Sequence, residues 1–345
     1  MTQPSPPKKD PADRYTIGWI CALDSEYMCA CRMLDEELPP PDLFRNARDE
    51  NTYVFGRLGN HYIVVTCLPG GQRRSTTATH VARDMAHTFP KLEFALAVGL
   101  AGGAPTAEND VRLGDVVVGA PGDGIPAVVD LSLEEMLPGG RLGQAQGTPA
   151  LNGPPERLLR AIPEMRRRYR DLRLPDAVAR HLERLGDMDE YLRPESDKLY
   201  HPDYAHVRGT GAGVGAGCEH CHDSFTVKRP KRKDQRLVQV HYGTIGSGST
   251  PLRDATLRDQ YANDPAMNIL CFDTISADLT NTVPCLAIRG ISNYCDSHAN
   301  GEWDKYAALA AAAYARELLL TLPAPHRVES MLPEYGEVVQ GPRNG

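Results

Sequence analysis

The stretch CLAIRGISNYCDSH, residues 285–298, combines a buried strand with side chains that can do chemistry. Its apolar first half predicts a strand, and Asn293 and Asp296 follow the turn expected at Gly290. α/β proteins place their ligands at the carboxyl ends of parallel strands. An amide does not exchange a proton near neutral pH, so Asn293 provides a hydrogen-bond donor and no acid. The segment is therefore a working site, a site adapted to another reaction, or a remnant of one.

A second segment, GGQRRSTT at residues 70–77, indicates an anion site. Two glycines permit close backbone approach, and the helix expected next presents free N–H groups to a phosphate. Arginine and hydroxyl side chains add further donors. The expected phosphate-binding residues of this segment are Gly70, Gly71, Arg73, Arg74, Ser75 and Thr76. The alternative is a turn and helix cap with solvated arginines.

Two patterns raise the question of a metal. Cys218 and Cys221 in CEHC have the spacing of a zinc half-site, but no second ligand pair follows within forty residues, which favours a loop ordered by packing. Asp273, Asp278 and Asn281 offer oxygen ligands for Mg²⁺, with surface-facing helix acids as the alternative.

The bulk properties exclude several classes of protein. A net charge of −7 over 345 residues argues against a nucleic-acid partner. The one basic run, KRPKRK at 228–233, predicts a solvated loop, with an anionic ligand or a localisation role as alternatives. No apolar run is long enough to span a membrane, and the amino-terminal residues do not resemble a signal peptide. Nine cysteines without such a signal predict reduced thiols and a cytoplasmic location.

Apolar runs alternate with amphipathic segments along the chain. We expect strands within residues 15–23, 61–68, 94–105, 113–121, 237–250, 268–279 and 284–291, and helices after 24, after 75 and over 305–322. Near-continuous apolar strands alternating with helices predict a mainly parallel sheet covered on both faces. The expected domain spans 14–322, with a disordered tail at 1–13, a large, partly mobile insertion at 122–235 that contains a helix pair near 155–185, and a polar tail at 323–345.

Four ordered motifs carry a resemblance to a known family. YTIGWICALDSEYMCACRMLDEE, VGLAGGAP with DVRLGDVVVGAP, HYGTIGSGST, and the segment from CLAIRGISN to YARELL are similar to the nucleoside phosphorylase domain of filamentous fungi. The resemblance implies a phosphorylase/hydrolase-like α/β fold with a mixed, mostly parallel central sheet flanked by helices. It also implies a homo-oligomer acting on a small phosphorylated molecule.

The resemblance also implies roles for single residues. Glu26 would orient water or ribose, a side chain of the segment CFDTISADL at 271–279 would lie near the sugar, and Asn293 would lie near the base. A phosphate pocket would include the glycine-rich segment above together with Gly18, Gly102 and Gly103. The catalytic candidates are Glu26, Asn293, Asp296 and Asp273, and the pocket candidates are Thr274, Ile275, Ser247, Arg289 and Tyr294.

Two positions depart from the family pattern. Ile275 stands where the family has the glutamate that holds the ribose hydroxyls, and Asn293 stands where it has an aspartate beside the base. A carboxylate–diol contact contributes about 2–3 kcal/mol, and a general acid about 10²–10⁴-fold in rate. Both departures disfavour ordinary ribonucleoside phosphorolysis.

Three functions are compatible with these residues. The first is an enzyme that keeps the anion pocket but ionises, cyclises or lyses an isoprenyl diphosphate, as terpene cyclases do. The second is a purine nucleoside phosphorylase or nucleosidase that cleaves the N-glycosidic bond of a nucleoside or deoxynucleoside. The third is a silent nucleotide-binding module. The sequence establishes no cofactor, and phosphate as co-substrate and Mg²⁺ are the candidates.

Overall fold

A computed structural model gives the fold of the chain. It describes residues 11–41, 49–70, 75–122, 124–137, 141–144, 151–207, 209, 217–232 and 236–323. The expected tails at 1–13 and 323–345 lie outside these ranges, except for residue 323 and residues 11–13, which begin the 3₁₀ helix η1 (Pro11–Arg14).

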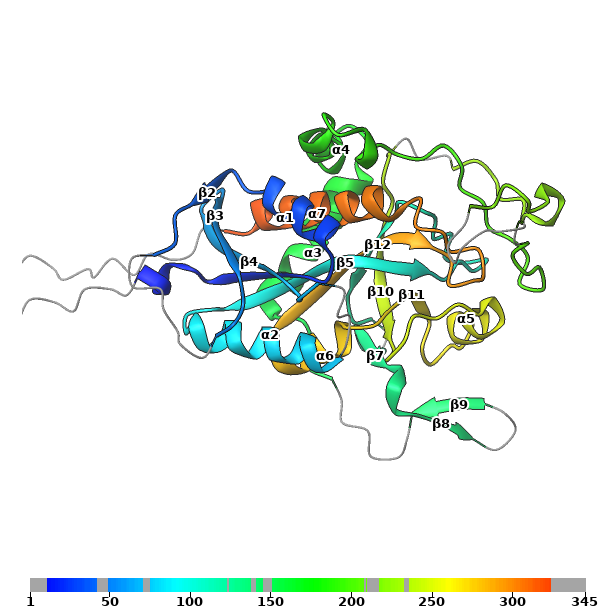
Figure 1. Cartoon of the computed structure of the whole chain (residues 1–345), viewed down its shortest axis with the longest axis horizontal. Helices are drawn as coiled ribbons and strands as arrows, with labels where there is room; N and C mark the ends of the chain where they lie inside the picture. Colours follow the sequence, from blue (N-terminus) through cyan, green and yellow to red (C-terminus); the bar gives the residue numbers. More distant parts are fainter. Residues whose placement is uncertain are drawn as a thin grey trace, which may run out of the picture.

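One large mixed sheet organises the described residues (Figure 1). Its spatial order is β11-β10-β6-β12-β5-β1-β4-β3-β2, with β7 paired to β10. These strands are β1 (Ile17–Cys21), β2 (Glu36–Leu38), β3 (Tyr53–Leu58), β4 (His61–Cys67), β5 (Phe94–Gly103), β6 (Val116–Gly119), β7 (Val128–Asp130), β10 (Val240–Ser247), β11 (Ile269–Asp273) and β12 (Cys285–Asn293). A separate hairpin joins β8 (Glu134–Leu137) and β9 (Arg141–Gln144).

The sheet is mostly parallel around β5 and closes on itself at one end. β1 pairs in parallel with β4 and β5, and β12 pairs in parallel with β5. β11 pairs in parallel with β10 and also antiparallel with the far end of β5, through Cys271–Gly103 and Phe272–Gly102. This second pairing brings the carboxyl ends of β11, β5 and β12 together. The predicted α/β class and mixed central sheet are confirmed.

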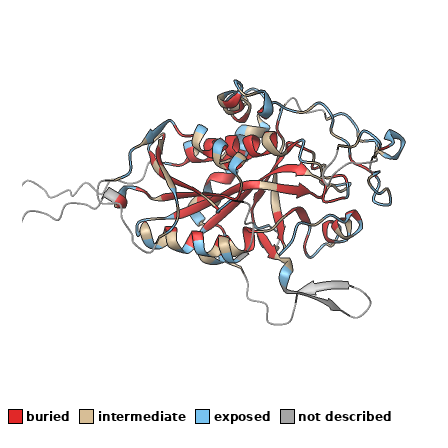
Figure 2. Ribbon diagram, in the orientation of Figure 1, coloured by how far each residue is buried: buried red, intermediate tan, exposed pale blue. Residues whose placement is uncertain are grey.

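Helices cover both faces of the sheet, as Figure 1 shows. α1 (Asp24–Arg32) and α7 (Asp304–Thr321) lie together on one face, while α2 (Ser75–Thr88) and α6 (Ser276–Thr282) lie together on the other. α5 (Ala255–Ala262) flanks β11. The central strands and α7 are almost wholly buried (Figure 2). Gly290 lets β12 approach α7, since a β-carbon there would collide with the carbonyl oxygen of Ala307.

The segment 122–235 is integrated into the fold through the parts of it that the structure describes. The expected helix pair is present as α3 (Glu156–Arg170) and α4 (Ala177–Leu182), and both helices pack against α7. β7 from the same segment extends the sheet beside β10. Its 3₁₀ helices are η2 (Leu131–Leu133), η3 (Glu183–Leu185), η4 (Asp189–Tyr191) and η5 (Asp223–Phe225).

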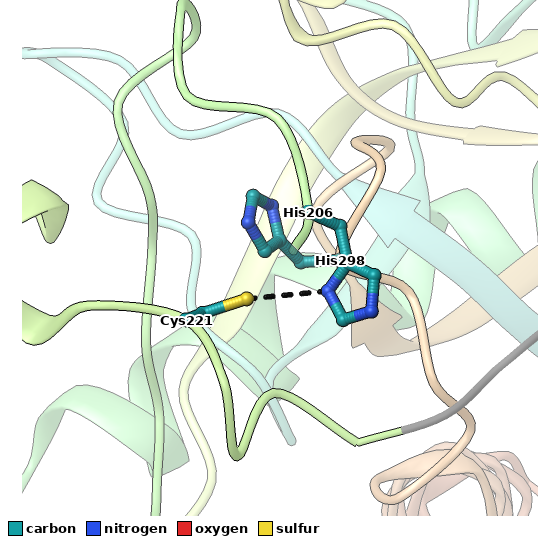
Figure 3. A group of neighbouring side chains, drawn as sticks. All are labelled: His206, Cys221 and His298. Carbon is teal, nitrogen blue, oxygen red and sulfur yellow. Dashed lines mark hydrogen bonds between the residues drawn. The ribbon is translucent and has the colours of Figure 1, made fainter. Parts of the chain in front are cut away.

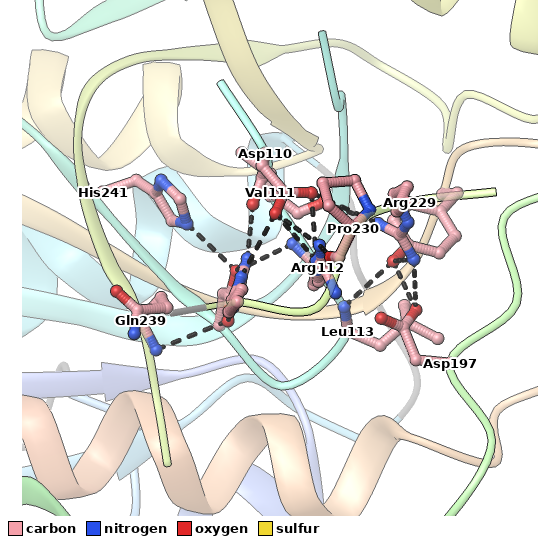
Figure 4. Close-up of polar contacts among 12 residues, drawn as sticks. Asp110, Val111, Arg112, Leu113, Asp197, Arg229, Pro230, Gln239 and His241 are labelled. Atoms are coloured by element: carbon pink, nitrogen blue, oxygen red, sulfur yellow. Dashed lines mark hydrogen bonds and ion pairs between the residues drawn. The ribbon is translucent and has the colours of Figure 1, made fainter. Parts of the chain in front are cut away.

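The prediction of a solvated basic loop at 228–233 is wrong for two of its arginines. Arg232 binds the buried carboxylate of Asp115 at 2.6 Å, and Arg229 binds Asp197 at 2.9 Å. Figure 4 shows this network, in which Asp110 and His241 also take part. Buried or half-buried carboxylates require such partners, so these cations fix the loop to the domain. No helix of the described residues has the length and apolar character needed to cross a bilayer.

Candidate functional site

A cavity of about 330 Å³ opens where β1, β5, β11 and β12 end. Its lining comes from the segments 22–26, 100–102, 251–253, 272–275 and 289–304, and it includes no residue of the predicted anion segment at 70–77. Its lining includes Ala22, Glu26, Leu100, Ala101, Gly102, Pro251, Leu252, Arg253, Phe272, Asp273, Thr274, Ile275, Arg289, Ser292, Asn293, Cys295 and Asp304. This arrangement follows from topology, because the carboxyl ends of neighbouring parallel strands meet at one edge of a sheet.

Glu26 is the buried acid of this cavity. It lies in the first turn of α1 with only 5% of its surface exposed. Its Oε2 accepts hydrogen bonds from the backbone N–H groups of Ala22 at 2.7 Å and Leu23 at 3.1 Å, and its Oε1 accepts from Leu100 N–H at 2.9 Å. A carboxylate offers about four acceptor positions, so one position on Oε1 stays open for a ligand.

The chain makes room for this carboxylate with a glycine. A β-carbon at Gly99 would lie 2.7 Å from Glu26 Oε1, closer than real contacts allow. Burial raises the pKa of Glu26, while the three backbone donors and the charge of Arg289 partly offset the shift. A glutamate with a raised pKa is a better general base near neutral pH than an exposed one.

Arg289 and Asp273 form a buried ion pair beside Glu26. Arg289 Nε lies 2.5 Å from Asp273 Oδ2, and both side chains are almost fully buried. The guanidinium also donates to the carbonyl of Ala97 at 3.0 Å and to the Ser276 hydroxyl at 2.8 Å. Burial alone would lower the pKa of Arg289, but the charges of Asp273 and Glu26 outweigh it and hold that pKa above its usual value.

The charges of this group do not cancel when Glu26 is ionised. Two carboxylates, Glu26 and Asp273, face one guanidinium, Arg289, which leaves one net negative charge in a largely buried wall. Fixed charges act strongly where water is excluded, and they favour a transition state of the opposite sign. The cavity is therefore suited to a reaction that develops positive charge in the substrate.

Asn293 lines the cavity, and two hydrogen bonds hold its amide. Its Oδ1 accepts the backbone N–H of Cys295 at 3.0 Å, which fixes the orientation of the amide. Its Nδ2 donates to the Ser292 hydroxyl at 3.2 Å, and the second N–H is left for a ligand. Gly102 makes space for this side chain, because a β-carbon there would lie 2.7 Å from Asn293 Oδ1.

Apolar groups form another part of the wall. Ile275 is 5% exposed and also packs into the core between the sheet and α2, and Thr274 lines the cavity beside it. Phe272 and Leu252 add apolar surface. At the rim, the exposed Arg253 makes no hydrogen bond or ion pair with any described residue.

Several residues singled out by sequence lie outside this cavity. Ser247 is buried and accepts the backbone N–H of Ala277 at 3.1 Å in the first turn of α6. The Tyr294 hydroxyl contacts Asp197 at 2.5 Å and Arg229 at 2.8 Å on the other side of β12. Asp296 lines an adjoining cavity of about 270 Å³.

The glycines expected around phosphate have different positions. Gly18 faces α2, since a β-carbon there would lie 2.6 Å from Met85 Sδ. Gly103 packs against Ile291 and pairs with β11, whereas Gly102 lines the cavity. The close contacts of Gly18 and Gly103 are typical of glycines that allow neighbouring strands and helices to pack closely.

The anion loop cannot be placed as a whole. Gly71, Arg73 and Arg74, as well as the side chain of Ser75, lie outside the described residues. Gly70 and Thr76 are exposed, and neither lines the cavity. The phosphate site therefore stays a prediction.

The magnesium candidates do not converge. Asp273 is bound by Arg289 and Ser276, Asp278 does not line the cavity, and Asn281 is exposed. Among the described residues, neither aspartate belongs to a group of three or more potential metal ligands.

Gly99 and Ser292 fall within the strand ends 99–105 and 289–298, where chemistry was predicted, whereas Arg253 and Asp304 of the cavity were not predicted. Gly99 had a usable signal, because it is a glycine inside an apolar strand, a position that often marks a close approach. Arg253 and Asp304 had none, since they stand among exposed polar residues beyond the ends of β10 and β12.

Comparison with known proteins gives one sequence relative and many structural ones. A nucleotide-binding leucine-rich repeat (NLR)-like protein of the fungus Hyaloscypha variabilis is 33% identical over 331 residues. The match covers 94% of this chain and 31% of that protein, so this chain spans about a third of its relative's length. No family model matches the chain.

The structural relatives share the phosphorylase/hydrolase-like fold. Futalosine hydrolase of Helicobacter pylori has a TM-score of 0.54 at 15% identity, covering 90% of this chain and 99% of its own. The 5′-methylthioadenosine/S-adenosylhomocysteine nucleosidase of Neisseria meningitidis, in complex with methylthio-immucillin-A, has a TM-score of 0.55 at 16% identity, covering 89% and 99%. At these identities the likeness establishes the fold, and it confirms the fold predicted from the sequence resemblance.

Proposed function

We propose that the protein hydrolyses the N-glycosidic bond of a nucleoside, as a divergent member of the nucleoside phosphorylase-like enzymes. The observation that carries the proposal is the buried carboxylate of Glu26, with an open acceptor position, opposite the amide donor of Asn293 in one cavity. The fold is shared with a futalosine hydrolase and a 5′-methylthioadenosine/S-adenosylhomocysteine nucleosidase, which supports a nucleoside as the substrate class here.

The geometry suggests a separate role for each of these residues in the reaction. Water adds to C1′ of the sugar while the C1′–N bond breaks and its electron pair moves to the base. Glu26 Oε1 accepts the proton of the attacking water. The transition state of glycoside cleavage resembles an oxocarbenium ion, and the net negative charge of Glu26, Asp273 and Arg289 stabilises it.

Asn293 would hold the leaving base. Its free amide N–H donates a hydrogen bond to an acceptor atom of the base. Asparagine cannot transfer a proton, so the base departs as a hydrogen-bonded anion and is protonated by solvent. This favours bases that are good leaving groups, such as 6-oxopurines.

A reaction on an isoprenyl diphosphate has less support than hydrolysis of a nucleoside. It requires several cations in the cavity for the leaving diphosphate, but Arg289 is paired with Asp273, which leaves Arg253 at the rim as the one unpaired cation among the described lining residues. It also draws on Mg²⁺ ligands that do not converge among the described residues.

A product screen with the full-length chain tests the proposal. Inosine, 2′-deoxyinosine and adenosine are incubated with and without phosphate, and geranyl and farnesyl diphosphates with and without Mg²⁺. Free base with free sugar is the expected result, and it should be independent of phosphate. Formation of sugar 1-phosphate would show that the enzyme is a phosphorylase and not a hydrolase. Released diphosphate without any free base would overturn nucleoside cleavage altogether.

A further inference from the structure

Two cysteines and two histidines converge beside the candidate active site, from segments far apart in the chain. Cys218 and Cys221 come from the CEHC motif, His206 precedes it, and His298 follows β12. The ligand atoms of His206, Cys221 and His298 lie within 4.8 Å of one another (Figure 3). Cys218 Sγ is 3.8 Å from His206 Nδ1. No second ligand pair follows CEHC within forty residues of the chain, but the fold brings His206 and His298 beside it.

The distances suit a tetrahedral ion. With Zn–S near 2.3 Å and Zn–N near 2.0–2.1 Å, neighbouring ligand atoms of a tetrahedral site lie roughly 3.3–3.8 Å apart. Cys221 Sγ is 3.3 Å from His206 Nδ1, and Cys218 Sγ is 3.8 Å from the same nitrogen. The 4.8 Å bound applies to His206, Cys221 and His298 and exceeds that range by about 1 Å. Cys218 does not belong to that group of three, so its side chain must rotate toward the ion together with small adjustments of the others.

His298 provides an independent indication of a ligand. Only 9% of its surface is exposed, and neither ring nitrogen has a hydrogen-bond partner. The Asp296 carboxylate approaches Nδ1 only to 3.7 Å, which is an ion-pair distance and too long for a hydrogen bond. An unsatisfied buried polar group costs about 1–3 kcal/mol. Stacking on Tyr200, with ring centroids 4.0 Å apart, holds the ring in this place.

We propose that Cys218, Cys221, His206 and His298 bind one structural Zn²⁺ ion. Two thiolates and two imidazoles in tetrahedral geometry are the ligand set of closed zinc sites. With one nitrogen of His298 on the metal, its other N–H would donate to Asp296, which would orient the ring as carboxylates do in many zinc sites. The proposal does not depend on which reaction the neighbouring cavity catalyses.

The ion would connect the insertion to the wall of the candidate active site. His298 belongs to the loop that follows Asn293, and the backbone N–H of His206 donates to Ser297 of that loop at 2.9 Å. The adjoining cavity is lined by Cys218 and His298 and shares Asn293 with the first cavity. A metal here would hold the loop that carries Asn293.

Metal content of the full-length protein, purified without a polyhistidine tag, tests the site. We expect about one zinc per chain by mass spectrometry, and near zero in each of Cys218→Ser, Cys221→Ser, His206→Ala and His298→Ala. His220→Ala and His222→Ala are matched controls, because His220 lies in the CEHC motif, His222 directly follows it, both are exposed, and neither belongs to the cluster. These controls should keep the zinc of the parent protein.

Two further measurements do not depend on the folding of variants. Co²⁺ added to metal-free wild-type protein should give the charge-transfer absorption of cobalt–thiolate bonds, and Zn²⁺ should abolish it. A chelator should lower Tm, and zinc should restore it, because a ligand that binds only the folded state stabilises that state. Wild-type protein without zinc after reconstitution, equal zinc in ligand and control variants, or a Cys218–Cys221 disulfide found by thiol titration would each overturn the proposal.

Discussion

The carboxylate of Glu26 occupies the space above Gly99 where any other residue would place its side chain, with Oε1 2.7 Å from the position of a β-carbon. The adjacent Leu100 N–H donates to the same oxygen at 2.9 Å. Gly99 in β5 thus sets the place of the candidate base.

Gly99→Ala should therefore displace Glu26 and remove most of the nucleosidase activity. We expect a loss in kcat/KM of about 10²–10⁴-fold, the usual contribution of a general base. Gly153→Ala is the control, since no atom lies within 4 Å of the added methyl group. Circular dichroism and melting curves should show that both variants fold. Undiminished activity of Gly99→Ala would separate Glu26 from catalysis.

The pH dependence of kcat/KM should report the ionisation of Glu26. The base must be ionised to accept a proton, and burial raises its pKa. Activity is therefore expected to rise with pH through an apparent pKa above that of an ordinary glutamate, which is about 4.3. Glu26→Gln should lose this acidic limb together with about 10²–10⁴-fold of rate. If the acidic limb of the pH profile is unchanged in Glu26→Gln, the ionisation that causes it belongs to another group.

Ile275 should make the enzyme prefer sugars without a 2′-hydroxyl. Its apolar side chain lines the cavity and leaves a ribose diol without a partner. Ile275→Glu should raise kcat/KM for inosine relative to 2′-deoxyinosine by about 30- to 150-fold, corresponding to about 2–3 kcal/mol.

The ratio between the two substrates is the useful measurement for Ile275, because it is independent of how much of the variant folds. Ile275→Gln serves as the uncharged control and should shift the ratio less. An unchanged ratio in Ile275→Glu would show that the sugar does not contact this residue.

Asn293→Asp should add the proton donor that the site lacks. A protonated carboxyl group would keep the hydrogen bond to the base and also transfer a proton to it, so we expect adenosine cleavage to accelerate by about 10²-fold or more. Asn293→Ala should instead slow the cleavage of every nucleoside. Steady-state rates on inosine and adenosine separate these outcomes, and identical rates for the three proteins would exclude a contact with the base.

Arg253 should favour substrates that carry a phosphate. It lies at the cavity rim and is not paired with any described residue. Arg253→Ala should raise KM for inosine 5′-monophosphate a few-fold, and by at most about tenfold, because exposed ion pairs contribute about 0.2–1 kcal/mol and charged hydrogen bonds somewhat more. KM for inosine should not change. Equal changes for both substrates would argue against a phosphate contact.

The fold was readable from the sequence where its signals are local. β1, β4, β5, β6, β10, β11 and β12 match apolar runs, and α7 matches the alanine-rich segment that closes the domain. β2, β3 and α5 were missed, because they are short or only partly buried and their hydrophobic patterns are weak.

Part of the candidate site could also be predicted, because the residues at strand ends are visible in the local sequence pattern. Glu26 follows β1, whereas Asp273, Arg289 and Asn293 lie in the carboxyl-terminal parts of β11 and β12. Strand ends in α/β sheets are expected to meet. Sequence order alone did not indicate that Tyr294, one residue beyond Asn293, points away to Asp197 and Arg229. Successive residues of a strand face opposite sides, so the exact register decides which of two neighbours enters a cavity.

By itself the sequence determined the elements, the α/β class and the residue types available at the strand ends, because hydrophobic periodicity and turn chemistry are properties of neighbouring residues. Only the tertiary structure decided which of those residues meet. The antiparallel contact of β11 with β5 brings Asp273 to the cavity, Gly99 admits Glu26, and His298 joins His206 beside CEHC. These contacts join residues dozens to hundreds of positions apart, and no local pattern records such a distance.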